Sequence, residues 1–564
     1  MQDCDNKQIE KIIAIPLKSL FYTNRQTWWL IGFSMIISGG ILTFPQVITS
    51  FIIEKDFSGI WIIWSALLGT AFGKVFFAHL WNKIPTKTEN ELILFRFSGT
   101  GAKILHIFRS LYVGGLIAPL ALSVAFIAFG RIVASLFDIS ENHAILSILI
   151  LVIVTTFFNS LKQRLKIDFI YLIIFVVCLI TIFFFLYSNI GSLTELQQAV
   201  VDQGDNLRLI PDMGTLAFNS FLVFVLVQWW SASIIDFPNI DGQKFMAAKD
   251  MNTISKSVVL PTLFMSFFLL LIYVIPFYIL MIDDYELLAS GELAFLTILQ
   301  NAIPSHMYFI VMIFFLLPFL SVVNNTQNWS SSLIIQNFYI HYINKNASDK
   351  QINRKGLVIM LLIVTVSALI AIMSDSILDV LKYLFVITAG VGPVFILRWY
   401  WHRINAWSQL SAMILSLIYP NVYELLFQKS PLFKHFIESL MDSWAIDYYP
   451  LKIVLLTIIV SLSWIAITYL TNPTDENTTQ RFAETVKPGG FWKHYQAGNS
   501  MFFQRLFTAV IFTLTGFLFY FSYWQFARGA YIHLFVLFSA YAILTYYGFV
   551  LLKRVNRITD YGER

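Results

Sequence analysis

Small and polar residues interrupt the first long apolar segment of the chain. Ser38, Gly39 and Gly40 stand near its middle, and Thr43 and Pro45 follow one turn later. These residue types disfavour a regular helix, and a helix broken inside a membrane exposes backbone groups that can bind a polar solute. An alternative is that the two glycines only permit close packing between helices. The pattern therefore predicts either a solute-binding site or a tight helix contact.

A cluster of hydrogen-bonding side chains marks a later apolar segment. Gln228, Trp229, Trp230 and Ser231 are consecutive there. The amide and indole N–H groups can bind a polar solute, and an indole ring can stack on a sugar or a cation. Since neighbouring helical residues point about 100° apart, we expect one of the two tryptophans to line a cavity. We expect this cluster to face the break in the first segment.

Charged residues at membrane depth form a third group of candidates. Lys74, in the middle of the second apolar segment, could bind an anionic substrate or stand in for a cation. Snorkelling or helix pairing would also explain it. Asp379 and Lys382 are three residues apart, and this spacing predicts that they pair with one another.

The elements that position these residues are membrane helices. Of the 564 residues, 57% are hydrophobic and only 13% are charged, and the mean hydropathy is +0.70. Soluble proteins contain about 25% charged residues, so a water-soluble fold is excluded. Cys4 lies in a polar tail and Cys178 in an apolar run, which predicts no disulfide. The net charge of +5 indicates basic cytoplasmic loops rather than a nucleic-acid partner.

Spans of about 20 apolar residues can cross a bilayer as helices. Lys and Arg concentrate in alternate loops and in both tails, which predicts cytoplasmic termini. About fourteen segments meet the length requirement, at residues 28–53, 58–81, 104–137, 143–162, 168–190, 214–236, 253–282, 303–341, 355–375, 378–402, 406–427, 450–471, 503–525 and 529–553.

The first ten segments show a weak internal repeat of five plus five. The third and eighth segments are unusually long, and the first and sixth are interrupted. Because five is odd, the second set has inverted topology, an arrangement typical of transporters with a site at the membrane midplane. The predicted divisions are a cytoplasmic tail (1–27), a first repeat (28–190), an external loop (191–213), a second repeat (214–402) and further C-terminal helices with a tail (403–564).

Six strings resemble, in order, motifs of the sodium:solute symporter family, in particular a bacterial branch with QWW and NAWS motifs. One of them, LRWYWHRINAWSQLSAM, is similar to the family pattern at almost every position. The strings cover Thr27–Met35, Glu89–Lys103, Gln228–Ser231 with Asp241–Asp250, Thr326–Ile343, Leu397–Met413 and Thr471–Trp492.

The resemblance implies an all-α LeuT-type fold with the solute between the first and sixth helices and Na⁺ between the first and eighth. It places the Na⁺ ligands at the carbonyls of Ile37, Gly40 and Pro318 and at the hydroxyl of Ser321. A hard cation suits such oxygen ligands. The family usually has a second hydroxyl where this chain has Val322, so Na⁺ affinity is expected to be lower unless Asn324, Asn325 or water substitutes.

Asp168 is a further position that the resemblance marks. In the family an aspartate at the inner start of the fifth helix lies on the exit route of Na⁺. An acidic residue there can equally offset the dipole at the N-terminus of a helix. Both interpretations stay open from the sequence.

The function that follows from the resemblance is Na⁺-coupled uptake of a small polar organic solute by alternating access, in a bacterial inner membrane and without an obligate protein partner. One alternative is a facilitator, proton-coupled carrier or sensor that has lost Na⁺ coupling. A remote alternative is a membrane acyltransferase in which His306 or His341 acts as a base. The sequence leaves the identity of the solute open.

Overall fold

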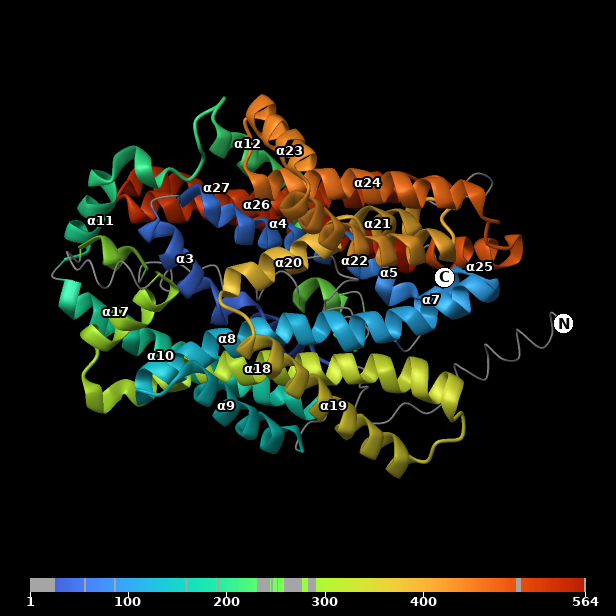
Figure 1. Cartoon of the computed structure of the whole chain (residues 1–564), viewed down its shortest axis with the longest axis horizontal. Helices are drawn as coiled ribbons and strands as arrows, with labels where there is room; N and C mark the ends of the chain where they lie inside the picture. Colours follow the sequence, from blue (N-terminus) through green and yellow to red (C-terminus); the bar gives the residue numbers. More distant parts are fainter. Residues whose placement is uncertain are drawn as a thin grey trace.

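The computed structural model describes residues 26–54, 57–85, 88–157, 161–190, 192–230, 244, 247–250, 252–257, 276–281, 291–492 and 499–561. In this part of the chain the secondary structure is helical, apart from isolated β-bridges that join Gln26 to Ala248 and Trp401 to Phe491. The long helices run side by side along the longest axis of the molecule (Figure 1). We call its two ends the α11 end and the α25 end, after the helices that lie there.

Long apolar helices confirm most of the predicted spans. Among the described residues, nine helices are long and apolar enough to cross a membrane: Gly99–Phe137, Leu161–Asn189, Ser305–Ile343, Asp349–Ile372, Ile377–Tyr400, Ala406–Lys429, Tyr448–Leu470, Phe502–Ala527 and Tyr531–Val555. Shorter apolar helices, at Trp28–Ile37, Phe44–Ile53, Phe57–Ala66, Glu141–Thr156 and Leu216–Gln228, fall within or overlap four other predicted segments. The remaining predicted segment, 253–282, lies largely outside the described residues.

The first span is broken where the sequence predicts. Helix α2 (Trp28–Ile37) ends at Ser38, a short 3-10 turn covers Gly40–Leu42, and helix α3 (Phe44–Ile53) completes the span. A Cβ atom on Gly39 would lie 3.1 Å from the carbonyl oxygen of Ile36, which is tight for a side chain. The corresponding break predicted after Trp230 lies outside the described residues.

The helices of the first half follow the predicted order. Two π-helical turns, Val113–Ile117 and Phe224–Gln228, continue α7 and α12. The helices are α4 (Trp61–Phe76), α5 (Ala78–Lys83), α6 (Glu91–Arg96), α7 (Gly99–Tyr112), α8 (Ala118–Phe137), α9 (Glu141–Thr156), α10 (Leu161–Ile190), α11 (Leu193–Asp202) and α12 (Leu216–Val223).

The second half repeats this pattern of long helices and adds a C-terminal set. A third π-helical turn, Ile335–Ile343, ends α18. The helices are α17 (Ala294–Ala302), α18 (Tyr308–Ile334), α19 (Asp349–Ile372), α20 (Ile377–Ala389), α21 (Gly392–Tyr400), α22 (Ala406–Lys429), α23 (Pro431–Trp444), α24 (Tyr448–Leu470), α25 (Glu476–Val486), α26 (Asn499–Ala527) and α27 (Tyr531–Tyr561).

Helix α18 is the central support of the site described below. It packs against α8, α10 and α19, and it also contacts α2 and the 3-10 turn that follows α2. At Gly114 the backbones come so close that a Cβ atom would lie 2.9 Å from the carbonyl oxygen of Ser330. The hydroxyl of Ser330 also donates a hydrogen bond to the carbonyl of Gly114. Small residues at this crossing therefore hold α18 against the helix formed by α7 and α8.

Four short helices cap the ends of the bundle in stretches predicted as loops. Helices α11 and α25 fold from the polar stretches 191–213 and 472–502, while α17 and α23 join neighbouring spans. Each of these helices is too short to cross a bilayer. At three of them a side chain caps the first turn, because Ser192, Ser430 and Asp475 accept hydrogen bonds from the backbone three residues on.

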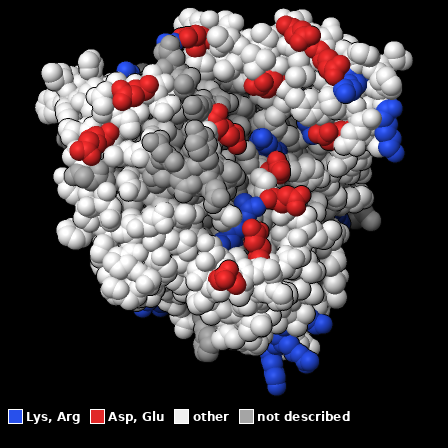
Figure 2. All heavy atoms as spheres, turned by 60° about the vertical axis from the view of Figure 1, so that its left-hand side comes forward, with Lys and Arg blue, Asp and Glu red and all other residues white. Residues whose placement is uncertain are grey.

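The α11 end carries several exposed acidic side chains. The view in Figure 2 brings the α11 end forward, where acidic side chains lie over the upper and middle parts of the face, with basic side chains among them and at the margins. Exposed acidic residues of this end include Asp138, Glu141, Glu195, Asp202 and Asp212. The α11 end therefore has the composition that the sequence predicts for the outer loops.

Candidate functional site

Asp168 is the centre of a buried cluster of oxygen and amide groups. Its carboxylate accepts hydrogen bonds from the hydroxyl of Ser34 on α2 (2.5 Å) and the hydroxyl of Ser321 on α18 (2.7 Å). The side-chain amide of Asn325, also on α18, donates a third hydrogen bond at 2.9 Å. Asp168 is only 2% exposed. A buried carboxylate needs such donors or a cation to offset the loss of hydration.

The break in the first span lies beside this cluster. Ser38 caps the end of α2, and its hydroxyl donates to the carbonyl of Ser34 at 2.6 Å. Ile37 is the last residue of α2, so its carbonyl belongs to a helix end that lacks regular helical partners, and Gly40 begins the 3-10 turn. Pro318, buried within α18, lies one turn before Ser321. The structure thus brings the elements of all the sequence-derived cation ligands into contact.

Position 322 is where the sequence departs from the family pattern. Val322 is partly buried among apolar neighbours and contributes no oxygen. Asn325 joins the cluster, since its amide also lies 3.3 Å from the hydroxyl of Ser321. Asn324 makes different contacts, because its side-chain oxygen accepts from Gln327 at 2.9 Å and its carbonyl accepts from Arg164 at 2.6 Å. Of the two asparagines considered as substitutes, Asn325 is therefore the one that joins Asp168.

The ligand types in this cluster suit a hard cation. It combines one carboxylate, serine hydroxyls and helix-end carbonyls, all of which are oxygen ligands. Within the described residues, no group of three His, Cys, Asp or Glu side chains gathers to form a transition-metal site. The oxygen donors around Asp168 are of the type that hard cations prefer.

The polar cluster near residue 228 makes contacts with three other helices. The amide of Gln228 donates to the carbonyl of Ile62 on α4 at 2.5 Å, and its oxygen accepts from Tyr449 on α24 at 3.2 Å. The indole of Trp230 donates to the carbonyl of Ala389 on α20 at 3.0 Å. The two adjacent indoles make different contacts, as expected for a helix, because Trp229 contacts Phe72 on α4, 5.1 Å away. Ser231 lies outside the described residues, and the role of this cluster in binding a solute stays a prediction.

Two other charged candidates have different outcomes. Lys74 lies on α4, but its side chain is not among those described. The predicted pair of Asp379 and Lys382 was wrong, since these two described side chains form no ion pair. Lys382 instead lies 5.6 Å from the ring centre of Tyr449, and exposed Asp379 stands in the first turn of α20, where the helix dipole favours an acid.

Three polar residues near the site were not singled out from the sequence. Ser34 lies one turn before Ser38 on α2, and Arg164 lies one turn before Asp168 on α10. Buried Lys244 donates to the hydroxyl of Ser38 at 2.7 Å. The helical spacing of four could have indicated the first two, whereas the contact of Lys244 joins segments about 200 residues apart.

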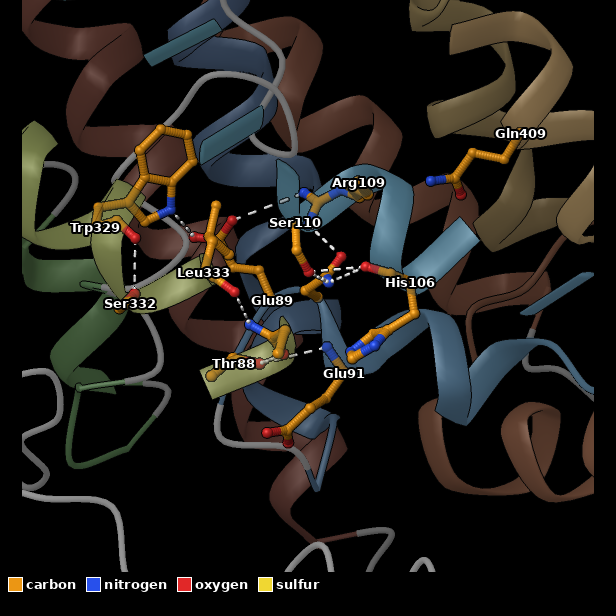
Figure 3. A network of polar contacts seen from close by, with 12 residues as sticks. Thr88, Glu89, Glu91, His106, Arg109, Ser110, Trp329, Ser332, Leu333 and Gln409 are labelled. Carbon is orange, nitrogen blue, oxygen red and sulfur yellow. Dashed lines mark hydrogen bonds and ion pairs between the residues drawn. The ribbon is translucent and has the colours of Figure 1, made fainter. Parts of the chain in front are cut away.

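A second buried network fixes the segment before α7 against two long helices (Figure 3). The indole of Trp329 donates to Glu89 at 3.2 Å, and Arg109 approaches the other oxygen of Glu89 at 3.9 Å. Thr88 donates to Asn337 at 2.7 Å. All five residues are at most 8% exposed. These contacts join α7, α18 and the turn at residues 88–90, so the network holds helices in place.

Three of the six motif strings meet at one arginine. Arg96, which is fully buried, donates to the carbonyls of Arg398 (2.9 Å) and Trp401 (3.1 Å), and its guanidinium lies 4.9 Å from the ring centre of Trp492. Burial lowers the pKa of Arg96 to about 9, so the side chain stays charged at neutral pH. The strings around residues 96, 398 and 492 therefore share a structural purpose, which is to tie α6, α21 and the segment after α25 together.

Comparison with solved structures bears on the fold. The fold resembles that of a Na⁺-coupled sialic acid symporter in a substrate-bound outward-open state, with a TM-score of 0.59, 16% identity, and coverage of 80% of this chain and 92% of that one. Mhp1, a nucleobase-cation-symport-1 family transporter, matches with a TM-score of 0.47 and 12% identity over 83% of this chain and 99% of its own. The protein is an all-α membrane protein with a LeuT-type fold of inverted repeats.

Sequence comparison identifies the family. The profile of the sodium:solute symporter family matches residues 26–416, and the chain belongs to this family. A curated relative, the osmoregulated proline transporter OpuE of Bacillus subtilis (strain 168), is 31% identical over 87 residues. That match spans 15% of this chain and 18% of the relative.

Proposed function

We propose that this protein takes up a small polar organic solute by Na⁺-coupled symport and alternating access. Membership of the sodium:solute symporter family supports this function. The observation that carries it is the buried carboxylate of Asp168, which gathers donors from α2 and α18 beside the break in the first span. A transporter needs such a site where two packed groups of helices meet.

In this proposal Na⁺ is a transported substrate, held by the residues around Asp168. The ligands are the carboxylate of Asp168, the hydroxyl of Ser321, and the carbonyls of Ile37, Gly40 and Pro318. Bound Na⁺ supplies a positive charge that offsets the buried carboxylate and bridges α2 to α18. Because that bridge stabilises one arrangement of the two helices, Na⁺ binding biases the conformational equilibrium that the solute also biases.

We place the solute next to this site, along the broken first span. Ser38, Gly39 and Thr43 offer backbone and hydroxyl groups from one side. In this proposal Lys74 and the residues Gln228, Trp229, Trp230 and Ser231, from the predicted second and sixth spans, complete the solute site. Both OpuE and the sialic acid symporter act on solutes that carry polar groups, which is the class proposed here.

We further propose that the α11 end faces outward and that both chain termini are cytoplasmic, in a bacterial inner membrane. The acidic α11 end supports this orientation, since basic residues concentrate on the cytoplasmic side of membrane proteins. In that orientation Asp168 lies near the inner end of α10, one turn after Arg164.

Thermal stability of the purified protein tests the function directly. The melting temperature is measured with a panel of sugars, amino acids and other small polar solutes, in NaCl or KCl at equal ionic strength. A ligand that binds the folded state raises this temperature by mass action. We expect at least one solute to stabilise the protein in NaCl and to do so much less in KCl.

A matched pair of variants ties the result to the site. Asp168→Asn removes the buried carboxylate, and Asp379→Asn makes the same change at an exposed position on α20. The Na⁺ effect should disappear in the first variant and persist in the second. A solute that stabilises wild type equally in NaCl and KCl would replace symport by a facilitative or proton-coupled carrier.

A further inference from the structure

Arg164 is a buried guanidinium with few partners. The side chain lies on α10 and is 3% exposed. One terminal nitrogen, Nη1, donates to the carbonyl of Asn324 on α18 at 2.6 Å. The other terminal nitrogen and Nε are buried without a hydrogen-bond partner in the structure. Such unsatisfied donors are costly, so an arginine kept in this position calls for an explanation.

Asp168 is the acidic neighbour that these free donors can reach. The two residues are four apart on α10, which places them on the same face and about 6 Å apart along the helix axis. In the structure the carboxylate points to Ser34, Ser321 and Asn325, and no ion pair joins these two described side chains. One carboxylate therefore has two possible charged partners, namely a cation in the site and Arg164.

We propose that Arg164 is the built-in counter-ion of Asp168 and takes over the carboxylate when the cation leaves. A change of side-chain rotamer moves the carboxylate from the site toward the free N–H groups of Arg164. Arg164 thereby lowers the affinity for Na⁺ and promotes its release away from the α11 end, since α11 follows the far end of α10. This inference rests on the proposed Na⁺ site.

A second positive charge near the site, Lys244, touches a different residue. Lys244 donates to the hydroxyl of Ser38, and Ser38 in turn bonds the carbonyl of Ser34. Lys244 thus acts on the end of α2, where a positive charge is favourable for the helix dipole. Arg164 is the cation on the same helix face as Asp168, and it is the one with free donors.

The experiment is an Na⁺ titration of the melting temperature of the purified full-length protein. Arg164→Gln removes the competing charge and should lower the Na⁺ concentration needed for half of the shift by about fivefold or more, the usual scale of coupled sites. Arg164→Lys keeps a positive charge and should stay near wild type. Lys166→Gln removes a charge from an exposed position on the same helix and should leave the titration unchanged.

A double variant separates competition from a general effect on folding. Removing Arg164 alone leaves Asp168 with less compensation and can destabilise the protein. Arg164→Gln combined with Asp168→Asn removes both charges, so it should be at least as stable as Arg164→Gln alone and should show no Na⁺-specific shift. Stability restored by the second change is itself a sign that the two charges are coupled.

Different results would overturn the proposed Na⁺-coupled symport and the proposed competition between Arg164 and Na⁺. If wild type shows no Na⁺-dependent shift, the proposed symport fails and this inference with it. A second result is that the melting temperature of wild type responds to Na⁺ while Arg164→Gln needs as much Na⁺ as wild type, or more. In that case the proposed competition by Arg164 is wrong and the proposed symport stands. The competition is also wrong if Lys166→Gln tightens Na⁺ binding as much as Arg164→Gln does.

Discussion

At the scale of single residues, the hydroxyl missing at position 322 is the clearest difference from the family. Val322 neighbours Ser321 on α18, whose hydroxyl bonds Asp168 at 2.7 Å. Val322→Ser adds one oxygen beside the proposed cation. We expect it to tighten Na⁺ binding about tenfold, which corresponds to about 1.4 kcal/mol. The Na⁺ titration of the melting temperature measures this change.

The control for that variant is Val322→Ala, which removes methyl groups without adding an oxygen. Its Na⁺ affinity should equal that of wild type. Its smaller side chain should cost some folding stability. Equal Na⁺ affinity in Val322→Ser and Val322→Ala would mean that position 322 does not face the cation.

Asp475 at the start of α25 gives a pH-dependent prediction. Burial raises its pKa, but hydrogen bonds that involve Ser98 and Thr478 lower it by more, so the pKa lies below its ordinary value. Because this pKa is lower in the folded state, the ionised Asp475 stabilises the fold above about pH 4. This stabilisation is lost as the pH falls through the folded-state pKa. We expect Asp475→Ala to cost about 1 kcal/mol at pH 7, the usual value of a helix cap, and less in acid.

Melting temperatures at pH 7 and in acidic buffer check this prediction. Asp475→Asn keeps an oxygen that can accept a hydrogen bond from the backbone N–H of Thr478. It should therefore lose less folding stability than Asp475→Ala. If Asp475→Ala loses the same folding stability at pH 7 and in acid, the charge of Asp475 does not contribute to stability.

The sequence predicted part of this site for identifiable reasons. The break at Ser38–Gly40 follows from local residue types, and Asp168 and Ser321 followed from the resemblance to the family. The contacts of Asp168 with Ser34 and of Lys244 with Ser38 join segments that only the folded chain brings together. No local pattern gives the rotamer of a side chain, which is why the ion pair of Asp379 with Lys382 was wrong.

At the scale of elements, the crossing of α7–α8 with α18 gives a paired test. A Cβ atom on Gly114 would lie 2.9 Å from the backbone oxygen of Ser330, whereas one on Gly115 would have no neighbour within 4 Å. Gly114→Ala should therefore cost about 1–3 kcal/mol from overpacking. Gly115→Ala should be neutral or slightly stabilising, because alanine favours helix.

Melting temperature in detergent distinguishes the two variants. Because α18 carries Ser321, Gly114→Ala is also expected to weaken the Na⁺ response, while Gly115→Ala leaves it intact. Equal loss of stability in both variants would contradict the close approach of these helices.

Helix boundaries show what hydropathy can and cannot predict. The long apolar segments gave the spans, since about 20 apolar residues leave few alternatives in a membrane. The short helices α11, α17, α23 and α25 were missed because they are amphipathic or polar and lie outside the bilayer pattern. The caps at Ser192, Ser430 and Asp475 are the local signals that could have indicated three of them.

At the scale of the whole molecule, the acidic side chains of the α11 end predict the orientation in the membrane. Single cysteines are placed at exposed Asp202 near the α11 end and exposed Glu484 on α25, in a background with Cys4 and Cys178 replaced by serine. A membrane-impermeant thiol reagent applied to intact cells should label Asp202→Cys but not Glu484→Cys. The opposite labelling pattern would invert the proposed topology.

The proposed transport mechanism depends on whether the cluster around Asp168 binds Na⁺. The most direct measurement is equilibrium binding of radioactive Na⁺ to the purified protein, for wild type, Asp168→Asn and Asp379→Asn. We predict saturable binding that is lost in Asp168→Asn and retained in Asp379→Asn. Undiminished Na⁺ binding in Asp168→Asn would contradict the proposed site.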